Sequence, residues 1–240
     1  MCIIANPKLY DLEGQINHKK EFIDKYIDMK NTKLYLLGHS IGGFMCLELM
    51  DRFSYIGNNV LKAVLVMPTL DRMVETVIGK QVNTMFQNYS SPLVFLATIL
   101  DAVLPEKLKR YAVSHLLKRD SKLFQLDKKQ TLPDCVISSA TNLLQPNCLR
   151  ALILMSLSEF RQVIKPNIEA IEKFYDKITI LYGENDHWSP VEFYNNLKSL
   201  ISNRVDARLC LGQIDHAFVI DRLGTETISQ IVIDVTLQNK

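Results

Sequence analysis

The chain has 240 residues, of which 48% are hydrophobic and 22% are charged, and its formal net charge is +2. This length and composition fit one folded domain with a sizeable core and argue against disorder. The small net charge argues against a nucleic-acid-binding protein, which usually carries a basic stripe. No metal-ligand constellation stands out, and no apolar run reaches the roughly 18 residues of a membrane span. Five cysteines without a CxxC pair predict free, buried thiols in a reducing compartment.

Strand and helix patterns alternate along most of the chain. Apolar residues at helical spacing predict helices at residues 14–29, from residue 44 onward, and at 225–237. Short apolar runs predict buried strands at residues 33–37, 61–67, 177–182 and 207–211. Strands that alternate with helices predict an α/β fold with a mostly parallel sheet covered on both faces.

A long insert, residues 69–173, separates the second predicted strand from the third and contains no convincing strand. Its many apolar residues predict a helical cap on a core made of residues 1–68 and 174–240. Residues 93–104 are mostly apolar and precede a basic amphipathic stretch at 105–119. The apolar run is either a buried cap helix or a segment that enters a lipid monolayer, because periodicity does not separate the two.

Directly after the first predicted strand, the residues Gly38-His39-Ser40-Ile41-Gly42 match the pattern G-x-S-x-G. In a strand–turn–helix context this pattern predicts a strained elbow that presents Ser40 as a nucleophile, with small residues on both sides. The amide of Ile41 would then be one donor to an oxyanion at a helix N-terminus. The alternative is a glycine-rich loop that merely ends a strand.

A carboxylate is needed to orient the base of such a serine, and in this fold class it follows a late strand. Asp186 lies in the loop directly after the strand at residues 177–182. Glu184 competes with it, two residues closer to the strand. Without a nucleophile, Asp186 reads as a turn residue or a helix cap; with Ser40 it is the better candidate acid.

The base is expected after the last strand, and His216 comes soon after the strand at residues 207–211. Asp215 beside it is expected to be structural. The alternative histidines are His18, His39, His115 and His187, and we expect His39 to help pack the elbow. His216 would take the proton of Ser40 as the hydroxyl attacks an acyl carbonyl, and water would release the acyl-enzyme. This chemistry needs no cofactor.

Several segments resemble the lipid droplet-associated hydrolase family of α/β-hydrolases. They are Leu12–Lys19, Leu36–Gly42, Pro68–Met73, Tyr182–Pro190 and His216–Phe218. The resemblance implies a serine hydrolase of neutral-lipid esters, with sterol esters as the leading class and with Ser40, Asp186 and His216 as its triad. It also implies a location on lipid droplets and on the cytosolic face of the endoplasmic reticulum.

The chain departs from this family before the elbow. Family members begin with several additional strands and a Pro-Gly-Asn-Pro-Gly loop, to which nothing in residues 1–11 corresponds. We therefore expect a shortened isoform, a fragment or an incomplete gene model, with an unpaired apolar edge at the strand of residues 33–37. Two alternative functions remain: a catalytically silent droplet-binding protein, and a hydrolase of thioesters or small esters.

Overall fold

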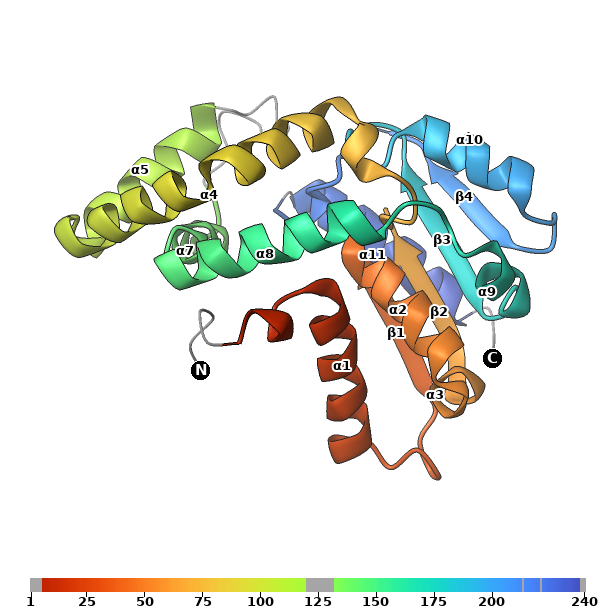
Figure 1. The fold of residues 1–240 in the computed structure, drawn as a ribbon. Helices are drawn as coiled ribbons and strands as arrows, with labels where there is room; N and C mark the ends of the chain where they lie inside the picture. Colours follow the sequence, from red (N-terminus) through yellow and green to blue (C-terminus); the bar gives the residue numbers. More distant parts are fainter. Residues whose placement is uncertain (1–5, 120–131, 213, 221, 238–240) are drawn as a thin grey trace.

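A parallel sheet of four strands forms the centre of the part of the chain that the structure describes. The structure is a computed structural model, and it describes residues 6–119, 132–212, 214–220 and 222–237. The strands neighbour one another in chain order: β1 (Leu34–His39), β2 (Val60–Val66), β3 (Ile178–Gly183) and β4 (Asp206–Cys210). All of them run parallel, so their carboxyl ends lie at one edge of the sheet (Figure 1). The predicted parallel α/β sheet is confirmed.

Helices cover both faces of the sheet at the central strands β2 and β3, which explains why most residues of these two strands are apolar and buried. In β2, Ala63 and Leu65 point into one core cluster, whereas Val64 and Val66 point into another. The second cluster is closed by one helix, α11 (Arg222–Leu237). The first cluster is closed by α1 (Leu12–Tyr26), α2 (Ile41–Arg52), α3 (Ser54–Asn59), α9 (Ile168–Lys173) and α10 (Val191–Leu200).

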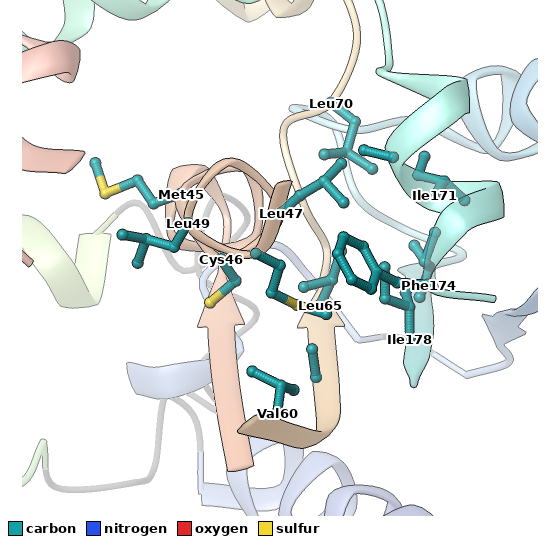
Figure 2. Close-up of a cluster of buried hydrophobic side chains, with 14 of the residues drawn as sticks. Met45, Cys46, Leu47, Leu49, Val60, Leu65, Leu70, Ile171, Phe174 and Ile178 are labelled. Carbon is teal, nitrogen blue, oxygen red and sulfur yellow. The ribbon is translucent and has the colours of Figure 1, made fainter. Parts of the chain in front are cut away.

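The larger core cluster lies between α2 and the sheet (Figure 2). Leu47 of α2 and Leu65 of β2 are almost completely buried in it. Ala170 and Ile171 of α9 belong to the same cluster, although the sequence assigned them to the insert. The last turn of the predicted insert therefore packs as part of the core.

Strand β1 is an edge strand, with β2 as its single neighbour among the described residues. Two of its apolar side chains stand in solvent: Tyr35 is 46% exposed and Leu37 is 61% exposed. By contrast, every residue of β3 is buried. An exposed apolar strand of this kind is open to pairing with another chain.

The insert is helical throughout its described part. Before α9 it comprises the short helix η2 (Met73–Glu75) and then α4 (Val77–Val103), α5 (Glu106–Arg119), α7 (Asp134–Leu143) and α8 (Pro146–Gln162). Helices α4 and α8 pack side by side through Phe86, Val94 and Ile153 (Figure 1). No helix in the described ranges is long and apolar enough to cross a membrane.

The cysteines are only partly buried. Cys46 and Cys210 are buried free thiols, but Cys135 and Cys148 are exposed. The expectation of buried thiols is therefore wrong for the two cysteines of the insert, which lie in the exposed first turns of α7 and α8. Cys2 lies outside the described residues.

Candidate active site

Ser40 stands at the sharp turn between β1 and α2. Its backbone has φ 54° and ψ −127°, a conformation that L-residues rarely adopt and that costs about 1–3 kcal/mol. Hydrogen bonds on both sides hold it there. The Ser40 amide donates to the Val66 carbonyl oxygen at 3.0 Å, and the Thr69 amide donates to the Ser40 carbonyl oxygen at 3.2 Å. The end of β2 thus fixes the turn that carries the serine.

The glycines of the elbow have different physical roles. A Cβ on Gly38 would lie 2.4 Å from the Gly42 carbonyl oxygen, and a Cβ on Gly43 would lie 2.6 Å from Cβ of Pro68. Both positions therefore require glycine for close approach. A Cβ on Gly42, however, would meet nothing within 4 Å. The expected steric reason for Gly42 does not hold in this structure.

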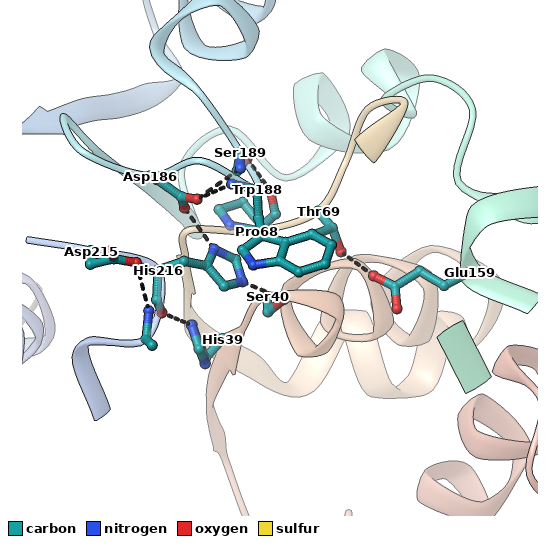
Figure 3. Close-up of polar contacts among 11 residues, drawn as sticks. His39, Ser40, Pro68, Thr69, Glu159, Asp186, Trp188, Ser189, Asp215 and His216 are labelled. Atoms are coloured by element: carbon teal, nitrogen blue, oxygen red, sulfur yellow. Dashed lines mark hydrogen bonds and ion pairs between the residues drawn. The ribbon is translucent and has the colours of Figure 1, made fainter. Parts of the chain in front are cut away.

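The side chains of Ser40, His216 and Asp186 form one hydrogen-bonded chain (Figure 3). Nε2 of His216 lies 2.8 Å from Oγ of Ser40, and Nδ1 lies 2.7 Å from Oδ2 of Asp186. An ionised carboxylate only accepts hydrogen bonds, so Nδ1 donates to Asp186 and Nε2 is left to accept the serine proton. The three residues selected from the sequence come together, and this arrangement suits proton transfer from serine to histidine. Their catalytic role remains a prediction.

Asp186 is only 2% exposed, and its carboxylate is held by the loop that carries it. The amides of Trp188 and Ser189 each donate to Oδ1 at 2.8 Å. These bonds satisfy one carboxylate oxygen and leave Oδ2 directed at His216 (Figure 3). The competitor Glu184 is exposed, and its Oε2 instead accepts a hydrogen bond from the Gly212 amide at 3.0 Å.

His39 contacts the histidine loop in addition to packing the elbow. Its Nε2 donates to the carbonyl oxygen of His216 at 2.9 Å, and its ring meets Phe218 edge-on with centroids 4.9 Å apart. Burial lowers the pKa of His39 from 6.5 to about 4, so this imidazole is neutral at pH 7. The expectation that His39 only packs the elbow is therefore incomplete. It also holds the His216 backbone through a hydrogen bond that the sequence did not indicate.

The remaining candidates lie away from this chain of hydrogen bonds or support it. His18, His115 and His187 are exposed. Asp215 accepts a hydrogen bond from the Ala217 amide at 3.3 Å, which fits its expected structural role. Ile41 is the first residue of α2, and amides in the first turn of a helix have no partner within it.

Two residues near the site were missed by the sequence analysis. Glu159 of α8 is only 7% exposed, and its Oε1 accepts a hydrogen bond from Oγ1 of Thr69 at 3.1 Å. Burial raises the pKa of Glu159 from 4.5 to about 7. Trp188 places its indole 6.3 Å from the His216 ring, centroid to centroid. Trp188 lies in the segment Tyr182–Pro190 that carries the family resemblance, but nothing there indicated its place beside His216. Glu159 belongs to no motif, and a lone glutamate in an apolar helix was the one available signal for it.

Solved structures share this architecture at low sequence identity. A meta-cleavage product hydrolase from Pseudomonas fluorescens superposes with a TM-score of 0.60 at 17% identity, covering 96% of this chain and 73% of that one. An esterase from Exiguobacterium antarcticum superposes with a TM-score of 0.58 at 18% identity, covering 93% and 74%. The chain therefore has the α/β-hydrolase fold.

The sequence pattern of one family, described as lipid-droplet associated hydrolase, matches residues 3–219. The chain belongs to this family. It is 32% identical to the mouse lipid droplet-associated hydrolase over 213 residues, which cover 89% of this chain and 60% of the mouse protein. It is 28% identical to the Drosophila melanogaster protein of the same name, covering 98% and 72%. The chain thus spans about 60% of the length of its vertebrate relatives.

Proposed function

We propose that this protein is a serine hydrolase of lipid esters in which Ser40, His216 and Asp186 act as the triad. The observation that carries the proposal is the continuous chain of hydrogen bonds from Ser40 Oγ through the His216 imidazole to Asp186 Oδ2, at 2.8 and 2.7 Å. Unlike a glycine-rich loop that ends a strand, the turn carries a strained serine within hydrogen-bonding distance of an oriented histidine.

In the proposed reaction, Ser40 Oγ attacks the ester carbonyl while His216 Nε2 takes its proton. The Asp186 carboxylate stabilises the imidazolium that forms, and the Ile41 amide stabilises the developing oxyanion. His216 then gives the proton to the alcohol, which departs as the ester bond breaks. The acyl group stays bound to Ser40 Oγ. A water molecule, deprotonated by His216, releases the acid. No cofactor takes part.

The family name supports lipid esters as the substrate class, and we propose sterol esters as the leading members. We also propose the surface of lipid droplets and the cytosolic face of the endoplasmic reticulum as the place of action. The exposed apolar side chains of the cap support contact with lipid. Those from residue 95 of α4 to the end of α5 include Phe95, Leu96, Ile99, Leu100, Val103, Leu108, Tyr111 and Leu116.

The faces of helix α4 differ in burial, which supports a packed inner face and a lipid-facing outer face. Val94 and Ala97 are buried against the rest of the cap, while Phe95 is 68% exposed and Val103 is 71% exposed. Residues 69–173 are therefore proposed to form a packed cap with an apolar outer face. Of the nearby basic residues, Lys109 is paired with Asp101 at 2.6 Å and is less available to lipid headgroups.

Labelling of the purified chain by a fluorophosphonate probe tests this proposal. The parent should be labelled, Ser40→Ala should not, and Ser199→Ala should behave as the parent because Ser199 lies on the surface of α10. If the parent is labelled, its rates of hydrolysis of cholesteryl oleate, trioleoylglycerol and an acyl thioester should then be compared. The two lipid esters should be preferred. No labelling of a folded parent would favour a catalytically silent droplet-binding protein, and preference for the thioester would overturn the lipid-ester assignment.

A further inference from the structure

The cap reaches the neighbourhood of the nucleophile through one buried polar pair. Glu159 comes from α8 in the cap, and Thr69 comes from the segment that follows β2. Their side chains are 7% and 1% exposed, and the Thr69 hydroxyl donates to Glu159 Oε1 at 3.1 Å (Figure 3). In the part of the chain that the structure describes, Thr69 is the one hydrogen-bond partner of this carboxyl group.

Thr69 lies between the elbow that carries Ser40 and the loop after β3 that carries Asp186. Its amide donates to the Ser40 carbonyl oxygen at 3.2 Å, so the same residue binds the nucleophile through its backbone and the cap through its side chain. Next to it, the Pro68 carbonyl oxygen accepts from Ser189 Oγ at 3.0 Å. Ser189 in turn donates its amide to Asp186. Residues 68–69 thus contact both ends of the triad through backbone atoms, which side-chain variants of Thr69 keep, and the Thr69 hydroxyl is left to bind the cap.

A buried carboxyl group is an expensive way to join two elements. Burial of an acid with one hydrogen bond costs free energy, and an apolar side chain of similar size often stabilises such a position better. Neighbouring Ser158 already links α8 to the core, because its Oγ accepts a hydrogen bond from the Leu12 amide at 3.1 Å. Stability alone therefore does not explain Glu159, whereas a required position of α8 relative to Ser40 does.

We propose that Glu159 is a positioning residue that, through the Thr69 hydroxyl, sets the place of cap helix α8 relative to the nucleophile. This inference rests on the proposed hydrolase function, but it concerns how the cap is placed and not which residues react. Glu159 does not act on the substrate itself. Its removal should weaken binding of esters long enough to touch the cap and spare small esters that touch only the elbow.

The test compares variants that break the pair with variants that keep its hydrogen bond. Thr69→Val and Glu159→Leu remove it, whereas Thr69→Ser and Glu159→Gln retain a hydroxyl donor and an oxygen acceptor. With p-nitrophenyl palmitate, the breaking variants should raise KM about tenfold, while kcat for p-nitrophenyl butyrate should change less than about twofold. The double variant Thr69→Val/Glu159→Leu should be no worse than either single one. The retaining variants should behave as the parent.

Thr179→Val is the matched control, because Thr179 is also buried and its hydroxyl also donates to a carboxylate, Asp206 Oδ2, at 2.8 Å. That pair joins the amino-terminal ends of β3 and β4, at the opposite end of the sheet from the triad. Thr179→Val should lower the free energy of unfolding. It should leave KM for p-nitrophenyl palmitate and kcat for p-nitrophenyl butyrate unchanged. An equal rise in KM in the control, or unchanged KM in Thr69→Val and Glu159→Leu, would overturn the proposal.

Hydrogen–deuterium exchange separates this inference from the proposed function. The breaking variants should speed amide exchange at least threefold in residues 153–162 of the cap, and the control should not. If the parent is neither labelled by the fluorophosphonate nor active, the hydrolase proposal fails while exchange still decides the role of the pair. Unchanged exchange in an active parent series would remove the positioning role and leave the triad standing.

Discussion

The Nε2 atom of His39 lies 2.9 Å from the carbonyl oxygen of His216, so the residue before the nucleophile holds the backbone of the proposed base. The two rings are also close, with centroids 5.1 Å apart. The elbow therefore positions the serine and, through one hydrogen bond, the loop that brings the histidine to it.

His39→Leu should lower the rate of fluorophosphonate labelling of Ser40 by about tenfold, because leucine keeps the packing against Phe218 but cannot hold the His216 loop. His39→Gln can still donate a hydrogen bond and should recover part of the rate. The measurement is the labelling rate at pH 8, with the fraction folded checked by circular dichroism. Equal rates in the parent and His39→Leu would remove this role from His39.

The pKa shifts of Glu159 and His39 should make opposite contributions to the pH dependence of stability. The pKa of Glu159 rises from 4.5 to about 7, so its contribution is largest below pH 4.5 and is lost as pH rises toward 7. The pKa of His39 falls from 6.5 to about 4, so its contribution is largest above pH 6.5 and is lost as pH falls toward 4. Each shift corresponds to on the order of 3 kcal/mol, and the two slopes oppose each other between pH 4.5 and 6.5.

Single variants should expose these slopes in urea unfolding. Glu159→Gln removes the first contribution, so its free energy of unfolding should rise more steeply than that of the parent between pH 4.5 and 6.5. His39→Gln removes the second, so its free energy of unfolding should fall over the same range. Parallel pH curves for the parent and both variants would show that neither group has the shifted pKa.

Asp186→Asn should lower kcat by about a thousandfold or more, with little change in KM, because an amide cannot stabilise the imidazolium and can favour the wrong tautomer of His216. Glu184→Gln is the matched control, since Glu184 is exposed and its carboxylate accepts a hydrogen bond from the Gly212 amide, away from His216. It should stay within about twofold of the parent. A large loss in Glu184→Gln with an active Asp186→Asn would reverse the assignment of the acid.

The sequence predicts those parts of the site that follow from strand ends. Ser40, Asp186 and His216 each come shortly after a strand, and parallel strands bring their carboxyl ends to one edge of the sheet. Glu159 escapes this reasoning because it comes from the cap, whose packing on the core no local pattern specifies. The role given to Gly42 was wrong for a related reason: the space around a Cβ depends on segments distant in the sequence.

The outer face of the cap should bind lipid through α4. Phe95 and Val103 are 68% and 71% exposed, and transfer of each side chain from water into acyl chains is worth about 1.5–3 kcal/mol. Phe95→Asp/Val103→Asp should therefore weaken binding to triolein droplets coated with phosphatidylcholine by at least about tenfold, measured by flotation. Turnover of p-nitrophenyl butyrate in solution should stay unchanged, because both side chains point away from the core.

Leu200→Asp, at a 57% exposed position on α10, is the control and should bind as the parent does. If the double variant floats with the droplets as well as the parent, another surface must carry the lipid contact.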